Sequence, residues 1–202
     1  MGRPSSWVVW LPLFLAVGCE KSAPSSGGSS GQPGEPRARA WVKREFIEKA
    51  SNEQLESVLV TCLRNAIGED QEKEAEIVRS WTPGKRMLYT TSTLEAEVNN
   101  GGFDQYFGNT QGQFSQMALE GLQLLGAGRH ADLLRRAIDI HKQEATLVSQ
   151  APKSDDTQAP GHAEENSALK RLDDEFFKLT ENLSALRVKF IRNHLDEFAT
   201  PS

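Results

Sequence analysis

From residue 41 onward, apolar residues recur three or four positions apart, which is the spacing of amphipathic helices. Ser51 opens the sequence SNEQ, a capping box that predicts the start of a helix ending at Gly68. Six further helices are predicted over about 72–81, 85–98, 113–125, 131–148, 166–179 and 183–198. No segment shows sustained alternation of period two, so no strand is predicted. The pattern therefore predicts an all-α fold, a single compact irregular helical bundle of about six to eight helices.

The first 19 residues have a different pattern. Arg3 is followed by the apolar run 7–17, which is shorter than the roughly 20 residues needed for a membrane-spanning helix. The run ends in LAVGC, which is similar to a bacterial lipobox, and we therefore interpret 1–19 as a lipoprotein signal peptide with lipidation at Cys19. A plain secretory signal, or a wrongly assigned start codon before a cytosolic protein, is the alternative.

Residues 20–40 are rich in Gly, Ser and Pro, a composition that predicts a flexible tether to the helical domain 41–202. The expected location is the bacterial cell envelope, on the periplasmic or surface face, with membrane contact through the lipid anchor only. The protein would be secreted or cytoplasmic if the signal interpretation is wrong. If Cys19 is lipidated, Cys62 has no disulfide partner, and its place on an apolar stripe predicts a buried, inert thiol.

The charge of the domain argues against one class of partner. The chain has 23 basic and 28 acidic residues, of which the first 40 positions hold four and two. Residues 41–202 therefore carry 19 basic and 26 acidic residues, a net charge of −7. Because nucleic-acid binding requires a basic face to neutralise phosphates, we expect no direct binding of DNA or RNA.

The sequence predicts no firm catalytic or metal-binding site. No two of the four histidines stand three to five positions apart, so no metal and no cofactor is predicted. A GxSxG elbow and the lysine of a phosphate-binding loop are both missing, so we expect no enzymatic activity. The adjacent acids Asp173, Asp174 and Glu175 in LDDEFFKL are predicted to form a solvated face of a helix.

The string VNNGGFDQYFGNT at 98–110 has the most specific composition in the chain. Its asparagines and glycines can end a helix, and Phe103 and Phe107 would then share one face of a restarted helix and plug the junction. The density of side-chain amides leaves a polar recess for a partner or ligand as the alternative. The candidate binding or structural corner comprises Asn99, Asn100, Gly101, Gly102, Phe103, Asp104, Gln105 and Tyr106.

The sequence EVNNGGFDQYFGNTQGQFSQMALEGLQLLGA, with LYTTSTLEAEV before it and LDDEFFKL after it, resembles a bacterial all-helical family over about 81–198. This family includes an acidic DNA-mimic protein and is otherwise of unknown function. The resemblance implies a helical fold and suggests a homodimer. It also implies surface carboxylates that imitate DNA phosphates and occupy the DNA site of a transcriptional repressor.

These observations predict a lipid-anchored, non-enzymatic helical domain that binds a protein partner. One alternative is an acidic DNA-mimic regulator that occupies the DNA site of a nucleic-acid-binding protein. A further alternative is an enzyme or ligand-binding domain centred on the NNGGFDQYF loop.

Overall fold

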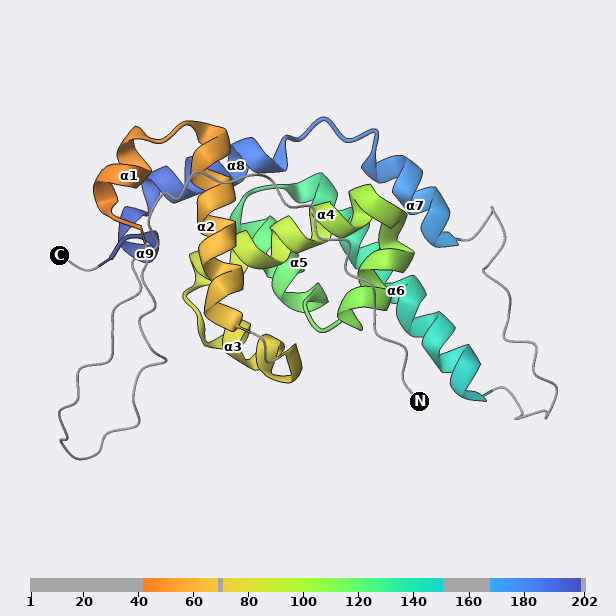
Figure 1. The fold of residues 1–202 in the computed structure, drawn as a ribbon. Coiled ribbons are helices and arrows are strands. Elements are labelled where there is room, and N and C mark those ends of the chain that lie inside the picture. The colour runs from red at the N-terminus through yellow and green to blue at the C-terminus, as the bar shows by residue number, and fades with distance from the viewer. Residues whose placement is uncertain (1–41, 69–70, 151–167, 201–202) are drawn as a thin grey trace, which may run out of the picture.

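The computed structural model describes residues 42–68, 71–150 and 168–200 (Figure 1). The predicted signal peptide, its Cys19 and the tether lie outside these residues. The helices are α1 (Arg44–Lys49), α2 (Asn52–Ile67), the 3-10 helix η1 (Gln71–Lys73), α3 (Glu74–Ser80), α4 (Pro83–Thr110), α5 (Ser115–Leu124), α6 (Gly128–Gln150), α7 (Ala168–Phe176), α8 (Leu183–Asn193) and α9 (Leu195–Phe198). The predicted all-α bundle is confirmed.

The predicted helix boundaries are reproduced best where capping chemistry fixes them. The Ser51 hydroxyl accepts a hydrogen bond from the Gln54 amide at 3.3 Å, and the Gln54 side chain accepts one from the Ser51 amide at 3.3 Å. Gly68 follows α2 with φ 75°, a conformation that L side chains rarely adopt. The segment predicted as one helix over 183–198 is divided at His194, where φ −132° and ψ 49° interrupt the helix. The described residues contain nine α-helices, more than the six to eight predicted, because they include short helices such as α1 and α9.

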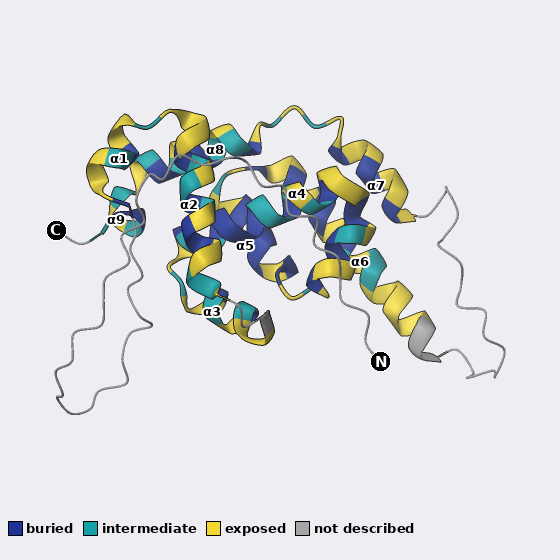
Figure 2. Cartoon of the chain, viewed as in Figure 1, coloured by how far each residue is buried: buried dark blue, intermediate teal, exposed yellow. Residues whose placement is uncertain are grey.

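Helix α4 runs through the middle of the molecule and contributes to both hydrophobic clusters (Figures 1 and 2). The start of α4 shares the first cluster with α1, α2, α3, α8 and α9, and the rest of α4 shares the second cluster with α5, α6 and α7. Helix α5 crosses α4 at Gly121, where a Cβ atom would lie 3.1 Å from the Met87 Cα. A side chain at that position would therefore push the two helices apart. Cys62 is buried in the first cluster, as its position on an apolar stripe predicted.

The two ends of the described domain meet. The Thr200 amide donates to the Val42 carbonyl at 3.0 Å, and Val42 and Ala199 form an isolated parallel bridge. Figure 1 shows this end, with α1 and α9, on the opposite side of the molecule from α6 and α7. Among the helices of the described residues, none is long and apolar enough to cross a membrane.

A buried ionic cluster joins α2, α4 and α8. Arg187 is buried, with only 2% of its residue surface exposed; its Nε donates to Glu56 of α2 and its Nη2 to Glu95 of α4. Ser184, one turn earlier on α8, donates to the second oxygen of Glu56. Because an arginine presents several N–H groups in a rigid fork, one side chain can hold two carboxylates from different helices. This cluster fixes the position of α8 against the other two helices.

Candidate functional site at the α4 kink

The string 98–110 forms a kink within α4 and not a loop. Gly101 has φ −159° and ψ 19°, and Gly102 has φ 79° and ψ −174°, whereas the residues on both sides are helical. Helix α4 therefore consists of two halves, with Asn100 ending the first and Phe103 beginning the second. The predicted helix end and the predicted restart at Phe103 are both present. Only two non-helical residues, Gly101 and Gly102, join the two halves.

Asp173 of α7 caps the second half of α4. Its Oδ1 accepts a hydrogen bond from the Phe103 amide at 2.8 Å, 70 positions away in the sequence. A Cβ atom on Gly102 would lie 2.7 Å from the Asp173 Cγ, so the carboxylate occupies the space that a side chain would take. A carboxylate at a helix N-terminus satisfies a free N–H group and interacts favourably with the helix dipole. Gly102 thus provides both the backbone conformation and the room for the cap.

The Asp173 carboxylate is buried, with 3% of its residue surface exposed. Burial raises the pKa of Asp173, and the nearby charges of Asp104 and Asp174 raise it further, while the Phe103 hydrogen bond and the Lys170 ammonium group lower it. The predicted solvated acidic face is therefore wrong for Asp173. It holds for Asp174, which is exposed, and for Glu175, which accepts two hydrogen bonds from Arg136 at 2.7 Å.

The aromatic residues of the string fill the space beneath the kink. Phe103, Tyr106 and Phe107 are all buried, with at most 4% of their surface exposed. The Phe103 ring packs against Phe107, as the spacing of four predicts, and edge-on against Phe176 of α7 at 6.0 Å. His141 of α6 stacks on Phe107 at 4.2 Å, with the ring planes nearly parallel. The corner is therefore a packed junction of α4, α6 and α7.

The four amide side chains divide into two pairs. Gln105 and Asn109 both donate to Oε2 of Glu97, at 2.7 and 2.8 Å, and so connect the two halves of α4 across the kink. Asn99 and Asn100 are exposed, and within the described part of the chain their side-chain amides make no hydrogen bond. Asp104 is exposed next to them. The outer surface of the corner thus presents two free amides and a carboxylate.

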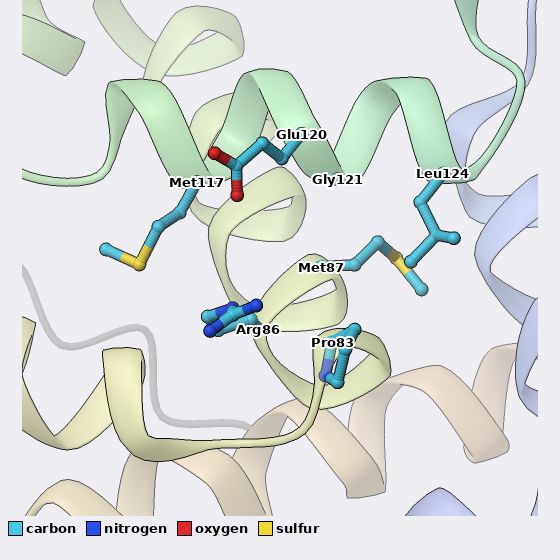
Figure 3. A pocket seen from close by; sticks show the side chains of 7 residues that line it. All are labelled: Pro83, Arg86, Met87, Met117, Glu120, Gly121 and Leu124. Atoms are coloured by element: carbon cyan, nitrogen blue, oxygen red, sulfur yellow. The ribbon is translucent and has the colours of Figure 1, made fainter.

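Two hollows on the described surface are lined by residues outside this corner. One, of about 180 Å³, lies between the start of α4 and α5 and is lined by Pro83, Arg86, Met87, Met117, Glu120, Gly121 and Leu124 (Figure 3). The other, of about 420 Å³, is lined by Lys142, Gln143, Thr146 and Leu147 near the end of α6. A polar recess at Asn99–Tyr106 was the alternative prediction from the sequence, and none of these residues lines either hollow. Among the described residues, no three His, Cys, Asp or Glu side chains are grouped so that they could hold a metal ion.

The model of the DMP19-like protein family matches residues 79–194, which is more than half of the chain. The chain belongs to the DMP19-like protein family. The matched range runs from α3 to the end of α8 and so contains the kink, Asp173 and Arg187. It confirms the resemblance stated on the NNGGF motif. No curated protein and no solved structure matches the chain.

The DMP19-like domain uses a second glycine and carboxylate at the start of α4. The Gly84 amide donates to Oε2 of Glu197 of α9 at 2.7 Å, and a Cβ atom on Gly84 would lie 2.6 Å from that oxygen. Thr82, at the N-cap position, makes no side-chain cap. Both halves of α4 are therefore capped by acids delivered from the C-terminal helices, each seated against a glycine.

Two residues of this architecture were missed by the sequence-based predictions, although the sequence contains a signal for both. Asp173 lies four positions after Leu169 and three before Phe176, and so falls on the buried stripe of α7. Arg187 lies four positions from both Leu183 and Ile191 on the buried stripe of α8. A charged residue on an apolar stripe indicates a buried partner, because an unpaired charge in the core is very costly. The apolar stripe does not indicate which residue of another helix each charge contacts.

Proposed function

We propose that this DMP19-like protein is a non-enzymatic protein-binding domain whose partner presents a basic surface. The observation that carries the proposal is the acidic surface around the kink. Asp104 of α4 and Asp174 of α7 are exposed, make no salt bridge within the described residues, and both lie close enough to raise the pKa of Asp173. The net charge of −7 over residues 41–202 adds a long-range attraction for a basic partner.

The packing beneath the corner favours a macromolecular partner over a small ligand. Small-molecule sites are usually concave and enclose most of their ligand. Here the interior is filled by Phe103, Tyr106 and Phe107, and the free polar groups point outward. An exposed surface with free amides and carboxylates over a filled interior suits a protein interface.

Capture from a cell extract on the immobilised full-length protein tests the proposal. We expect a captured protein to be released by rising salt and to bind several-fold more weakly to an Asp104→Asn/Asp174→Asn variant, because two carboxylates are lost from the interface. A Glu72→Gln/Glu76→Gln variant removes the same charge from exposed positions of η1 and α3 and serves as the matched control. Equal weakening by both variants, or capture that is insensitive to salt, would contradict the proposal.

A second candidate function, favoured by membership of the family, is DNA mimicry. In that case the partner would be a nucleic-acid-binding protein, and the carboxylates would occupy its DNA site. Duplex DNA added to the same capture experiment distinguishes the two functions. Release of the partner by DNA at constant ionic strength supports mimicry, whereas retention supports a basic partner surface that does not bind DNA. Family resemblance also makes a homodimer part of this proposal.

We also propose that the domain is anchored to a membrane of the cell envelope through a lipid on Cys19, with 20–40 as the tether. The arrangement of the domain suits such an anchor, because Val42 enters at the α1–α9 end and the kink lies toward the α6–α7 side (Figure 1). A tether of this length would have an end-to-end distance of roughly 25 Å. The acidic corner would then lie at the end of the domain farther from the attachment of the tether.

Replacement of Cys19 by serine tests the anchor. We expect Cys19→Ser to move the protein from the membrane fraction to the soluble fraction and to abolish incorporation of a labelled fatty acid, with the circular dichroism spectrum unchanged. A Cys62→Ala variant keeps Cys19 and should stay with the membrane. If Cys19→Ser remains in the membrane fraction, or the wild type is soluble, the anchor proposal is wrong.

A further inference from the structure

We propose that Asn100 is a site of spontaneous deamidation, by which its neutral amide becomes a carboxylate. Asn100–Gly101 is the only Asn-Gly pair in the sequence. Both residues are exposed, and the Asn100 amide makes no hydrogen bond within the described residues. The pair lies immediately before Gly102, at the kink of α4. This inference does not depend on the proposed function.

The reaction uses only groups of the chain and water. The backbone nitrogen of Gly101 attacks Cγ of Asn100, so that a new C–N bond forms and the bond from Cγ to the side-chain nitrogen breaks. That nitrogen leaves as ammonia, taking the proton from the Gly101 amide, and a five-membered succinimide remains. Water then opens one of the two ring carbonyls and gives either aspartate or isoaspartate.

The local geometry favours this attack at Asn100 over the other asparagines of the corner. Gly101 has no Cβ to shield its nitrogen, and it is the first residue of α4 with non-helical backbone angles. Asn99 is followed by Asn100, whose side chain and helical backbone hinder the same approach. Asn109 donates its amide to Glu97 at 2.8 Å and is followed by Thr110, which is buried. Asn99 and Asn109 are therefore internal controls.

The cap on the second half of α4 sets how often the attack geometry is reached. Asn100 is itself helical, and its backbone must turn for Cγ to approach the Gly101 nitrogen. Only the last turn of the first half has to open, since regular geometry stops at Asn100. The hydrogen bond from the Phe103 amide to Asp173 holds the other side of the kink. Loosening that bond should increase the population of the open form and the rate of deamidation.

The modification would change the surface of the corner in two ways. Aspartate at position 100 adds a negative charge beside the exposed Asp104. Isoaspartate also lengthens the main chain by one methylene group directly before the two non-helical glycines. The corner would thus become more acidic, and its backbone less regular, as the protein ages.

Peptide mapping of the full-length protein, after incubation at mildly alkaline pH and physiological temperature, tests the proposal. We expect aspartate and isoaspartate at position 100 to accumulate roughly tenfold faster than at positions 99 and 109, a difference of about 1.4 kcal/mol in activation free energy. A rate at Asn100 no greater than that at Asn99 and Asn109 would overturn the proposal. This comparison is made within one molecule and needs no variant.

Two variants give further tests on protein shown to be folded by circular dichroism. Gly101→Ala should slow the reaction at Asn100 several-fold, because the new Cβ hinders the attacking nitrogen; it would meet the movable Gln105 side chain, 2.9 Å from its Cδ. Asp173→Ala should accelerate the reaction, because the Phe103 amide loses its cap. An unchanged rate in Gly101→Ala would contradict the role proposed for the missing Cβ of residue 101.

Discussion

Replacing Arg187 with methionine is expected to lower the free energy of unfolding by about 3–5 kcal/mol. The Arg187 side chain is 3% exposed and donates to Glu56, which is 14% exposed, and to Glu95, which is 29% exposed. Without the guanidinium group, two carboxylates from α2 and α4 face each other with no cation between them. The loss of an ionic partner is costly because the charges that remain are only partly solvated. Methionine keeps most of the side-chain volume, so the change isolates the charge.

Urea denaturation followed by circular dichroism measures the free energy of unfolding. Two further variants show whether the loss comes from the unpaired charges. Lys189→Met removes a cation from an exposed position of the same helix and should change stability by less than about 0.5 kcal/mol. A triple variant, Arg187→Met with Glu56→Gln and Glu95→Gln, should recover most of the loss because no unpaired charge remains. A loss below about 1 kcal/mol in Arg187→Met, or no recovery in the triple variant, would contradict this account.

The features that were predictable from the sequence are those fixed by residues close together in the chain. The capping box at Ser51 spans three positions, and the Phe103–Phe107 contact spans four. Their geometry follows from the helix itself, so periodicity and capping rules are sufficient. The all-α fold and the membership of the DMP19-like family follow from the same local signals.

The features that were not predictable are contacts between distant segments. The Asp173–Phe103 hydrogen bond joins residues 70 positions apart, and the ion pairs of Arg187 join residues 92 and 131 positions apart. A single sequence shows that a charge lies on an apolar stripe, but the packing of α7 on α4 decides which group it meets. For this reason Asp173 was assigned to a solvated face, although its own helix placed it toward the core.

The two capped halves of α4 give a physical reason for the glycines of this domain. At Gly84 and at Gly102, a carboxylate from a later helix is seated where a Cβ would lie, and it accepts a hydrogen bond from the first turn of the helix half. The acid can reach the backbone only if the side chain is missing. The two glycines of NNGGF therefore have different roles, because Gly102 receives Asp173, while Gly101 faces the Gln105 side chain.

Gly102→Ala is expected to destabilise the protein by about 3–5 kcal/mol, for two separate reasons. The backbone at φ 79° and ψ −174° lies in a region that only glycine adopts without strain of about 1–3 kcal/mol. The new Cβ would also lie 2.7 Å from the Asp173 Cγ and displace the carboxylate, so the buried Phe103 amide loses its acceptor at a cost of about 1–3 kcal/mol. Urea denaturation gives the sum of the two terms.

A double-mutant cycle separates the two causes. In an Asp173→Ala background there is no carboxylate for the new Cβ to displace, so Gly102→Ala should cost only the backbone strain. The coupling energy between the two substitutions should therefore be about 1–3 kcal/mol. Gly108→Ala, in the second half of α4, is the matched control. No atom lies within 4 Å of a Cβ at that position, so alanine should stabilise the helix by about 0.5–1 kcal/mol. A coupling energy near zero would mean that Gly102 is needed for its backbone angles alone, and that the close approach of Asp173 is incidental.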